Sequence, residues 1–229
     1  MDASIVMLSR PLTDAATQYA ASLARVLAVR LVQAPPAGAP PASPAPPAHQ
    51  PLLLVLPGSA SAEHLADEAQ RTLRASALPV LVVPSPAAGR MPPRRIALAA
   101  EGEPFVLGTG LRALNALLLT LPTRLTVLHS QLPQGHYSAA DALHAVQACG
   151  LALRHLTIDA REVPALDPAS GILAGVQELE ADLLVLPVRP RRPHGPAFAG
   201  SVVARVLARS PVPVLLLPVD TLREGRWAA

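Results

Sequence analysis

Two stretches of the chain share one layout: EAQRTLRASALPVLVVP at Glu68–Pro84 and VVARVLARSPVPVLLLP at Val202–Pro218. Each begins with apolar residues at helical spacing, continues through a proline, and ends in a short apolar run before another proline. A short run without polar alternation is typical of a strand that is buried on both faces of a parallel sheet. The layout therefore predicts a helix followed by a buried strand, present twice in the chain.

Two further apolar runs complete strand–helix–strand units. Leu52–Leu56 precedes the first copy of the layout, and Leu183–Leu186 precedes the second. The intervening helices are predicted over Glu63–Ala77 and Ser201–Arg209, because apolar residues recur there at helical spacing. On the second helix we expect the buried face to hold Val202, Val206 and either Ala208 or Arg209. A strand, a helix and a parallel strand form a βαβ unit, so the fold class is α/β with a doubly wound parallel sheet.

The chain is predicted to contain two such units in tandem. Each unit opens with a strand, at Ile5–Leu8 and at Ile96–Ala99, followed by a helix rich in alanine and leucine. The proline-rich segment Pro84–Pro93 is the best boundary between them. We predict an abbreviated unit at residues 1–90, whose residues 34–50 form a proline- and alanine-rich linker, and a complete unit at residues 91–229.

The composition limits the classes of partner. Of the 229 residues, 51% are hydrophobic and 15% are charged, which suffices for a core without disulfides or metal. The net charge of +3 is mild, and aromatic residues make up only 2% of the chain, so no base-stacking surface and no nucleic-acid partner are expected. No apolar run approaches the roughly 20 residues of a membrane helix, so no membrane partner is expected. A single cysteine, Cys149, fits a reducing cytoplasm, where we expect the protein to reside.

Several stretches resemble the universal stress protein family. Ile5–Gln33 is similar to that family's opening strand, helix and second strand. In the other unit, Leu125–His129 is similar to the family's second strand, and Gly200–Pro218 is similar to its typical C-terminal stretch. The resemblance implies a Rossmann-like fold of the adenine nucleotide alpha hydrolase type. It also implies a third strand of the complete unit, which we place at Leu151–Ile158.

The same resemblance implies how the two units meet. In this family the last strand often pairs across a two-fold axis, so Val80–Val83 is expected to pair with Val214–Leu217. That pairing would protect two apolar edges and form an internal pseudo-dimer, although a homodimer of two chains stays open as an alternative.

Many members of the family bind ATP through a glycine-rich loop that leads into the last helix. Its pattern is Gly, two residues, Gly, nine residues, Gly, then Ser or Thr. Gly200 and Ser201 match the final pair, but Pro187 and Pro190 stand where the first two glycines belong, and proline has no amide to donate to a phosphate. In the first unit Ala66-Asp67 replaces the final pair, so that unit is expected to have lost the site.

Charged residues offer a substitute for the missing amides in the second unit. Glu101 falls where the family has an aspartate that contacts the nucleotide, and arginines of the loop Pro187–Gly195 lie near a predicted helix N-terminus. The candidate nucleotide site therefore comprises Glu101, Arg189, Arg191, Arg192, Gly200 and Ser201. The alternative interpretation of the arginines is an ordinary solvated basic loop.

No catalytic constellation and no metal site is predicted. The chain has no G-x-S-x-G, H-E-x-x-H or C-x-x-C motif, and His129, at the end of a predicted strand, is interpreted as structural. The first hypothesis is a non-enzymatic stress-response or regulatory protein with a degenerate nucleotide site and no cofactor. The second keeps ATP binding by the second unit, and the third is slow ATP hydrolysis or nucleotide transfer. The sequence identifies no protein partner.

Overall fold

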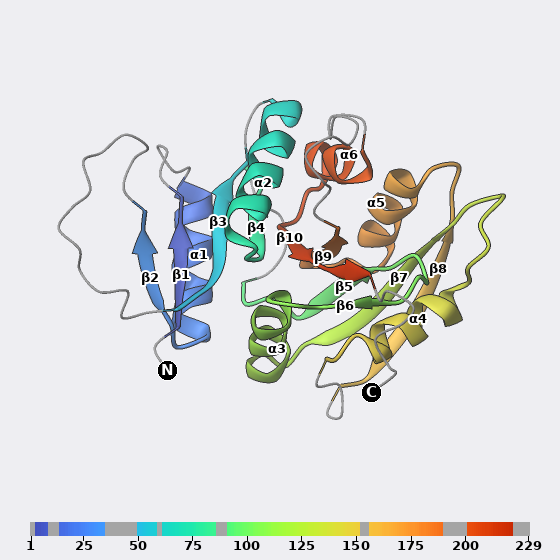
Figure 1. Cartoon of the computed structure of the whole chain (residues 1–229), viewed down its shortest axis with the longest axis horizontal. Helices are drawn as coiled ribbons and strands as arrows, with labels where there is room; N and C mark the ends of the chain where they lie inside the picture. The colour runs from blue at the N-terminus through green and yellow to red at the C-terminus, as the bar shows by residue number, and fades with distance from the viewer. Residues whose placement is uncertain are drawn as a thin grey trace.

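The computed structural model describes residues 3–8, 14–34, 50–58, 61–85, 91–151, 156–189 and 201–221. Nine strands within these residues form one sheet, in the order β2-β1-β3-β4-β10-β9-β5-β7-β8 (Figure 1). These strands are β1 (Ala3–Met7), β2 (Arg30–Gln33), β3 (Gln50–Pro57), β4 (Val80–Val83), β5 (Arg95–Ala99), β7 (Arg124–Gln131), β8 (Ile158–Pro164), β9 (Leu183–Val188) and β10 (Val214–Pro218). A second, two-stranded sheet pairs β6 (Phe105–Val106) with β11 (Asp220–Thr221).

Helices cover both faces of the large sheet. They are α1 (Asp14–Val26), α2 (Ala62–Ser76), α3 (Gly110–Thr120), α4 (Ala139–Ala148), α5 (Pro168–Glu178) and α6 (Val202–Arg209). One hydrophobic core joins the sheet to α1, α3 and α4, and a second core joins the other face to α2, α5 and α6. Within β9, Val185 belongs to the first core and Leu186 to the second, because successive side chains of a strand point to opposite faces. This two-sided burial explains the continuous apolar runs and confirms the α/β, doubly wound fold class.

All neighbouring strands of the large sheet are parallel except β4 and β10. These two pair antiparallel, with Leu81 opposite Leu215 and Val82 opposite Val214. The expected pairing of the two apolar runs is therefore confirmed, and it joins residues 3–85, the N-terminal half, to residues 91–221, the C-terminal half. The division into units at residue 90 stays a prediction. Most of the predicted linker, residues 35–49, lies outside the described residues.

The predicted position of the third strand of the C-terminal half was wrong. The strand is β8, which begins at Ile158 and not at Leu151, and it pairs with β7. Because β8 lies at the edge of the sheet, most of its residues are exposed, so its sequence IDAREVP is polar. Leu151 and Leu156 instead contribute to the core from outside the strand.

The predicted buried face of α6 was also partly wrong. Val206 is buried, but Val202 is only half-buried, and Ala208 and Arg209 are exposed. The buried residues are Val203, Ala204, Val206 and Leu207. The helix contacts both α2 and α5. Its buried stripe is therefore wider than predicted and begins at Val203 instead of Val202.

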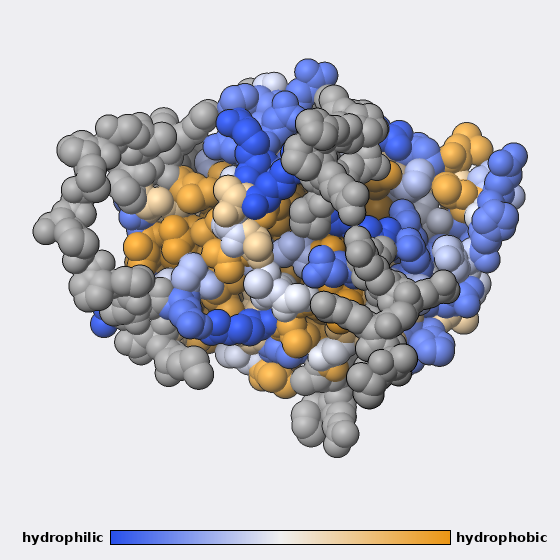
Figure 2. Space-filling view, in the orientation of Figure 1, coloured by the Kyte–Doolittle hydropathy of each residue, from blue (hydrophilic) through white to orange (hydrophobic). Residues whose placement is uncertain are grey.

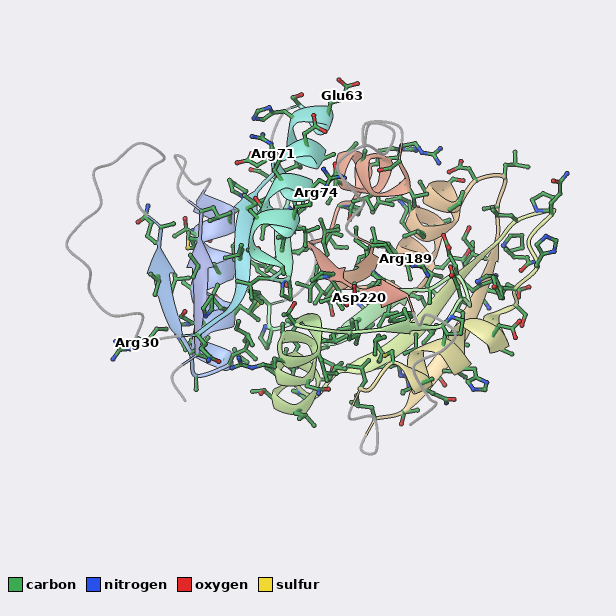
Figure 3. The ribbon with its side chains drawn as sticks, viewed as in Figure 1. Arg30, Glu63, Arg71, Arg74, Arg189 and Asp220 are labelled. Atoms are coloured by element: carbon green, nitrogen blue, oxygen red, sulfur yellow. The ribbon has the colours of Figure 1, made fainter. Side chains whose placement is uncertain are left out.

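The outer part of the N-terminal half is less covered. In the edge strand β2 every residue is exposed, including Leu31 and Val32. Apolar surface is visible over β1 and β3 (Figure 2). By contrast, α2 turns Glu63, Arg71 and Arg74 to solvent (Figure 3) and packs Leu65 and Leu73 into the core.

Candidate functional site

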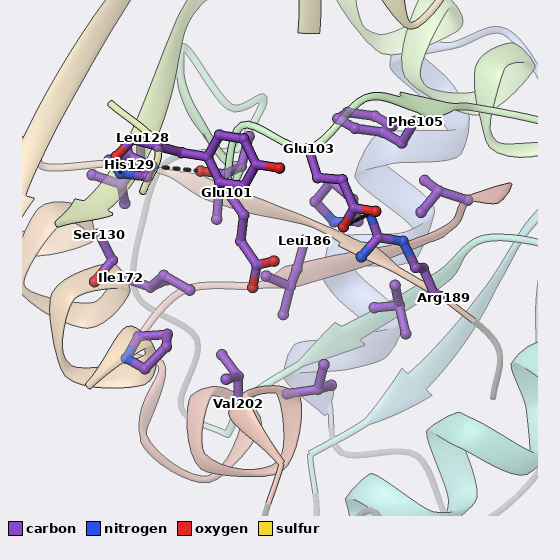
Figure 4. A pocket seen from close by; sticks show the side chains of 18 of the residues that line it. Glu101, Glu103, Phe105, Leu128, His129, Ser130, Ile172, Leu186, Arg189 and Val202 are labelled. Atoms are coloured by element: carbon purple, nitrogen blue, oxygen red, sulfur yellow. Dashed lines mark hydrogen bonds and ion pairs between the residues drawn. The ribbon is translucent and has the colours of Figure 1, made fainter. Parts of the chain in front are cut away.

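A cavity of about 520 Å³ opens at the carboxyl ends of β5, β7 and β9 (Figure 4). The strand order reverses at this place: from β5 the chain continues to β7 on one side and returns to β9 on the other. In open α/β sheets, ligands bind in the crevice at such a reversal. The cavity is therefore a candidate binding position by its place in the fold, independently of which residues line it.

The lining of the cavity combines apolar walls with a few charged groups. Ile172 of α5, Leu186 of β9 and Val202 and Val203 of α6 supply apolar surface. The polar and charged lining residues include Glu101, Glu103, His129, Tyr137, Arg189 and Ser201. Of the six predicted site residues, three thus line one cavity: Glu101, Arg189 and Ser201. Arg191, Arg192 and Gly200 lie outside the described residues.

Glu101 and Glu103 diverge from the end of β5. Gly102 between them has a φ of 108°, and a Cβ atom at this position would lie 2.7 Å from Cβ of Tyr137. Only glycine adopts this conformation readily and leaves room for the tyrosine. Figure 4 shows the Glu101 carboxylate pointing into the cavity and the Glu103 carboxylate turned toward Arg189.

Arg189 is paired within the chain. Its Nη2 atom lies 2.8 Å from Oε2 of Glu103, and both side chains are about half-exposed. The preceding residue, Val188, is fixed because its carbonyl oxygen accepts a hydrogen bond of 3.0 Å from the amide of Val219. The predicted phosphate ligand thus lies beside the cavity, but its charge is balanced by a carboxylate that sequence reasoning missed. The two partners are far apart in the sequence, so no local pattern links them.

His129 holds a loop over the cavity. The side chain is buried, and Nδ1 lies 3.1 Å from the carbonyl oxygen of Ala100 at the end of β5. Nε2 lies 3.0 Å from the carbonyl oxygen of Tyr137 and 3.1 Å from Oε1 of Gln131. The structural interpretation of His129 is confirmed, although β7 continues two residues beyond it, to Gln131.

A His129→Ala variant is expected to loosen the loop at residues 132–137. The carbonyl of Tyr137 loses its imidazole partner, and the buried ring leaves a void, so amide hydrogen exchange in this loop should accelerate about tenfold or more. Hydrogen exchange followed by mass spectrometry measures this. The control is His136→Ala, in the same loop, where the side chain is exposed. Equal exchange rates in the two variants would contradict the assigned role.

Ser201 caps helix α6 beside the cavity. Its Oγ atom accepts a hydrogen bond of 3.2 Å from the amide of Ala204. The N-terminus of α6, with its favourable dipole for anions, therefore lies at the cavity.

The corresponding region of the N-terminal half differs. Helix α2 begins at Ala62, with Ser61 as its cap, and continues through Ala66 and Asp67. The predicted equivalence of Ala66-Asp67 with the loop–helix junction was therefore wrong. The physical reason is length: α2 has 15 residues and α6 has 8, so α2 extends further toward its N-terminus. The amides of Ala66 and Asp67 lie inside a helix and are not available to a phosphate.

Two carboxylates belong to the capping interactions of helices: Asp167 is the N-cap of α5, and Asp141 completes the capping box of Ser138 at the start of α4. The pKa of Asp167, the cap of α5, is lowered mainly by a hydrogen bond from the amide of Ser170, and Asp167 also pairs with Arg205 of α6 at 3.0 Å. The pKa of Asp141 in α4 is lowered mainly by the hydroxyl of Ser138. Because these pKa values fall on folding, the caps contribute stability above the ordinary carboxyl pKa and lose it as the pH falls.

The described parts of the chain contain neither a metal-binding cluster nor a membrane-spanning helix. Among these residues, no group of three or more His, Cys, Asp or Glu side chains is placed to hold a metal ion. No helix in the same parts is long and apolar enough to cross a bilayer.

Comparisons with known proteins give a family and a fold. The model of the universal stress protein family matches residues 49–218. A universal stress protein from Archaeoglobus fulgidus DSM 4304 is 15% identical over 94% of this chain and 86% of that chain, with a TM-score of 0.55. A functionally unknown protein from Pseudomonas aeruginosa PAO1 is 17% identical over 96% and 83%, with a TM-score of 0.49.

A third solved structure, a universal stress protein in complex with cAMP, is 22% identical over 56% of this chain and 98% of that chain, with a TM-score of 0.43. The search of curated proteins gave no match.

Proposed function

The chain belongs to the universal stress protein family, and from this premise we propose that it is a non-enzymatic stress-response regulator whose cavity is a reduced nucleotide site. One observation carries the proposal. Pro187 lines the cavity at the end of β9, where a phosphate cradle requires backbone amides, and proline has none to donate. With Pro187, the site keeps the position of a nucleotide pocket and has at least one amide fewer for holding a triphosphate.

The remaining lining suits the nucleoside part of an adenine nucleotide. The cavity of about 520 Å³ lies within the range of about 300–1,000 Å³ that is usual for small-molecule sites. Its apolar walls suit a base, and the carboxylate of Glu101 suits ribose hydroxyls, which acidic residues bind at the same edge of related sheets. We therefore propose adenine nucleosides and their monophosphates as the ligand class.

Isothermal titration with adenosine, AMP and ATP with Mg²⁺ tests this proposal. We expect adenosine and AMP to bind more tightly than ATP, because each added phosphate brings negative charge to a cavity in which Pro187 offers no amide. A phosphate-release assay is expected to show no ATP hydrolysis above the protein-free rate. Tighter binding of ATP than of adenosine, or measurable hydrolysis, would overturn the proposal.

ATP binding is the second candidate, and the position of Ser201 favours it. Ser201 lines the cavity at the N-terminus of α6, so that terminus could receive a phosphate even without the first glycines. The same titration separates the two candidates, because a site of this kind would bind ATP more tightly than adenosine. Slow hydrolysis or nucleotide transfer ranks third, since it needs bound metal and phosphates at the altered loop.

A further inference from the structure

The ion pair between Glu103 and Arg189 connects two strand ends across one side of the cavity. Glu103 follows β5, Arg189 follows β9, and both side chains line the cavity. In Figure 4 the pair lies beside Phe105, away from the centre into which Glu101 points. When a ligand enters the cavity, Arg189 is therefore already paired with the carboxylate of Glu103.

Both partners are held by the same C-terminal segment. Phe105, two residues after Glu103, is buried and pairs with Thr221 in the small sheet. Val188, directly before Arg189, pairs with Pro218 and accepts the hydrogen bond from Val219. The backbone on each side of the pair is thus fixed by residues 218–221, which reduces the entropy that the two side chains lose when they pair.

We propose that Glu103 is a selectivity determinant that weakens the binding of phosphate-bearing ligands, AMP relative to adenosine included, by occupying Arg189. A guanidinium group binds carboxylates and phosphates with the same planar fork, so Glu103 and a ligand phosphate compete for one partner. Glu103 also adds negative charge beside the place that a phosphate would enter. The cavity thereby prefers a phosphate-free nucleoside, an inference that rests on the function proposed above.

The experiment is a Glu103→Gln substitution, with adenosine and AMP as the two probes. Glutamine keeps the size of the side chain and removes the charge, which frees Arg189 for the phosphate. The affinity for AMP is expected to rise about tenfold, whereas that for adenosine changes less than about twofold, because adenosine carries no group for Arg189. The double variant Glu103→Gln/Arg189→Gln is expected to lose the gain in AMP affinity.

The matched control is Glu180→Gln. It removes the same charge from another exposed glutamate–arginine pair, Glu180 with Arg95, at the opposite end of the strands. An equal gain in AMP affinity in this control would assign the effect to net charge and overturn the inference.

The two probes separate the inference from the proposed function. Adenosine binding with no change in AMP affinity on Glu103→Gln would overturn the selectivity role and leave the proposed function standing. Absence of binding of both probes to the wild type and to the variant would overturn the proposed function itself.

Discussion

A Gly175→Val variant is expected to lose about 3 kcal/mol or more of its free energy of unfolding. Gly175 lies on the face of α5 that packs on β7, and a Cβ atom there would lie 2.3 Å from Cδ1 and 2.7 Å from Cδ2 of Leu128. Leu128 is fully buried between the helix and the sheet and lines the cavity, so its side chain must shift toward the cavity or helix and strand must separate. Urea denaturation measures the resulting loss of stability.

The smaller substitution Gly175→Ala tests whether the free energy of unfolding rises or falls. Helix propensity alone predicts that alanine stabilises the helix by about 1 kcal/mol, whereas the close approach predicts destabilisation. Gly108→Ala is the matched control, because the nearest atom to a Cβ there is 3.9 Å away. A Gly175→Ala protein more stable than the wild type would contradict the packing described for α5 and β7.

The second large effect is expected at the junction of the two halves. Leu215 is fully buried and lies opposite Leu81 in the antiparallel pair of β10 and β4. Leu215→Ala should lower the free energy of unfolding by about 3–5 kcal/mol, because it leaves a cavity in the middle of the sheet. The exposed Leu119 of α3 provides the control, since Leu119→Ala should change stability by less than about 0.5 kcal/mol.

The same variant tests whether the halves unfold together. In one cooperative sheet, Leu215→Ala should raise amide hydrogen exchange in β1 and β3 as well as in β5 and β7. Exchange that rises only among residues 91–221 would show that the N-terminal half is stable without its neighbour. It would also favour the predicted division of the chain into separate units.

The sequence predicted best those elements in which burial dictates the residue types. Leu183–Leu186 and Val214–Leu217 are covered on both faces, so their apolar runs identified them as central strands. The edge strand β8 carries polar residues, and for that reason its predicted position was shifted to the more apolar Leu151–Ile158. The start of α2 was predicted to within one residue, but Ala66-Asp67 was wrongly equated with the junction before α6, because the repeat aligns the ends of the two helices and not their different beginnings.

The candidate site was predictable only in part. Glu101 and Ser201 were found because the family resemblance places each on a position of the nucleotide-binding pattern, and both line the cavity. The partner of Arg189 was not found, since a contact between two strand ends depends on the sheet order and on the turn at Gly102. His129 was identified as structural, but its contacts with two backbone carbonyl oxygens become visible only in three dimensions.

The pairing of β4 with β10 has a consequence for how the protein can evolve. When two identical subunits meet at their last strands, any mutation in the gene alters both sides of the contact at once. Here the two sides are encoded separately, as VLVV and VLLL, so each can change while the other is kept. Residues 3–85 can therefore change independently of residues 91–221, provided that β4 still covers the edge of β10.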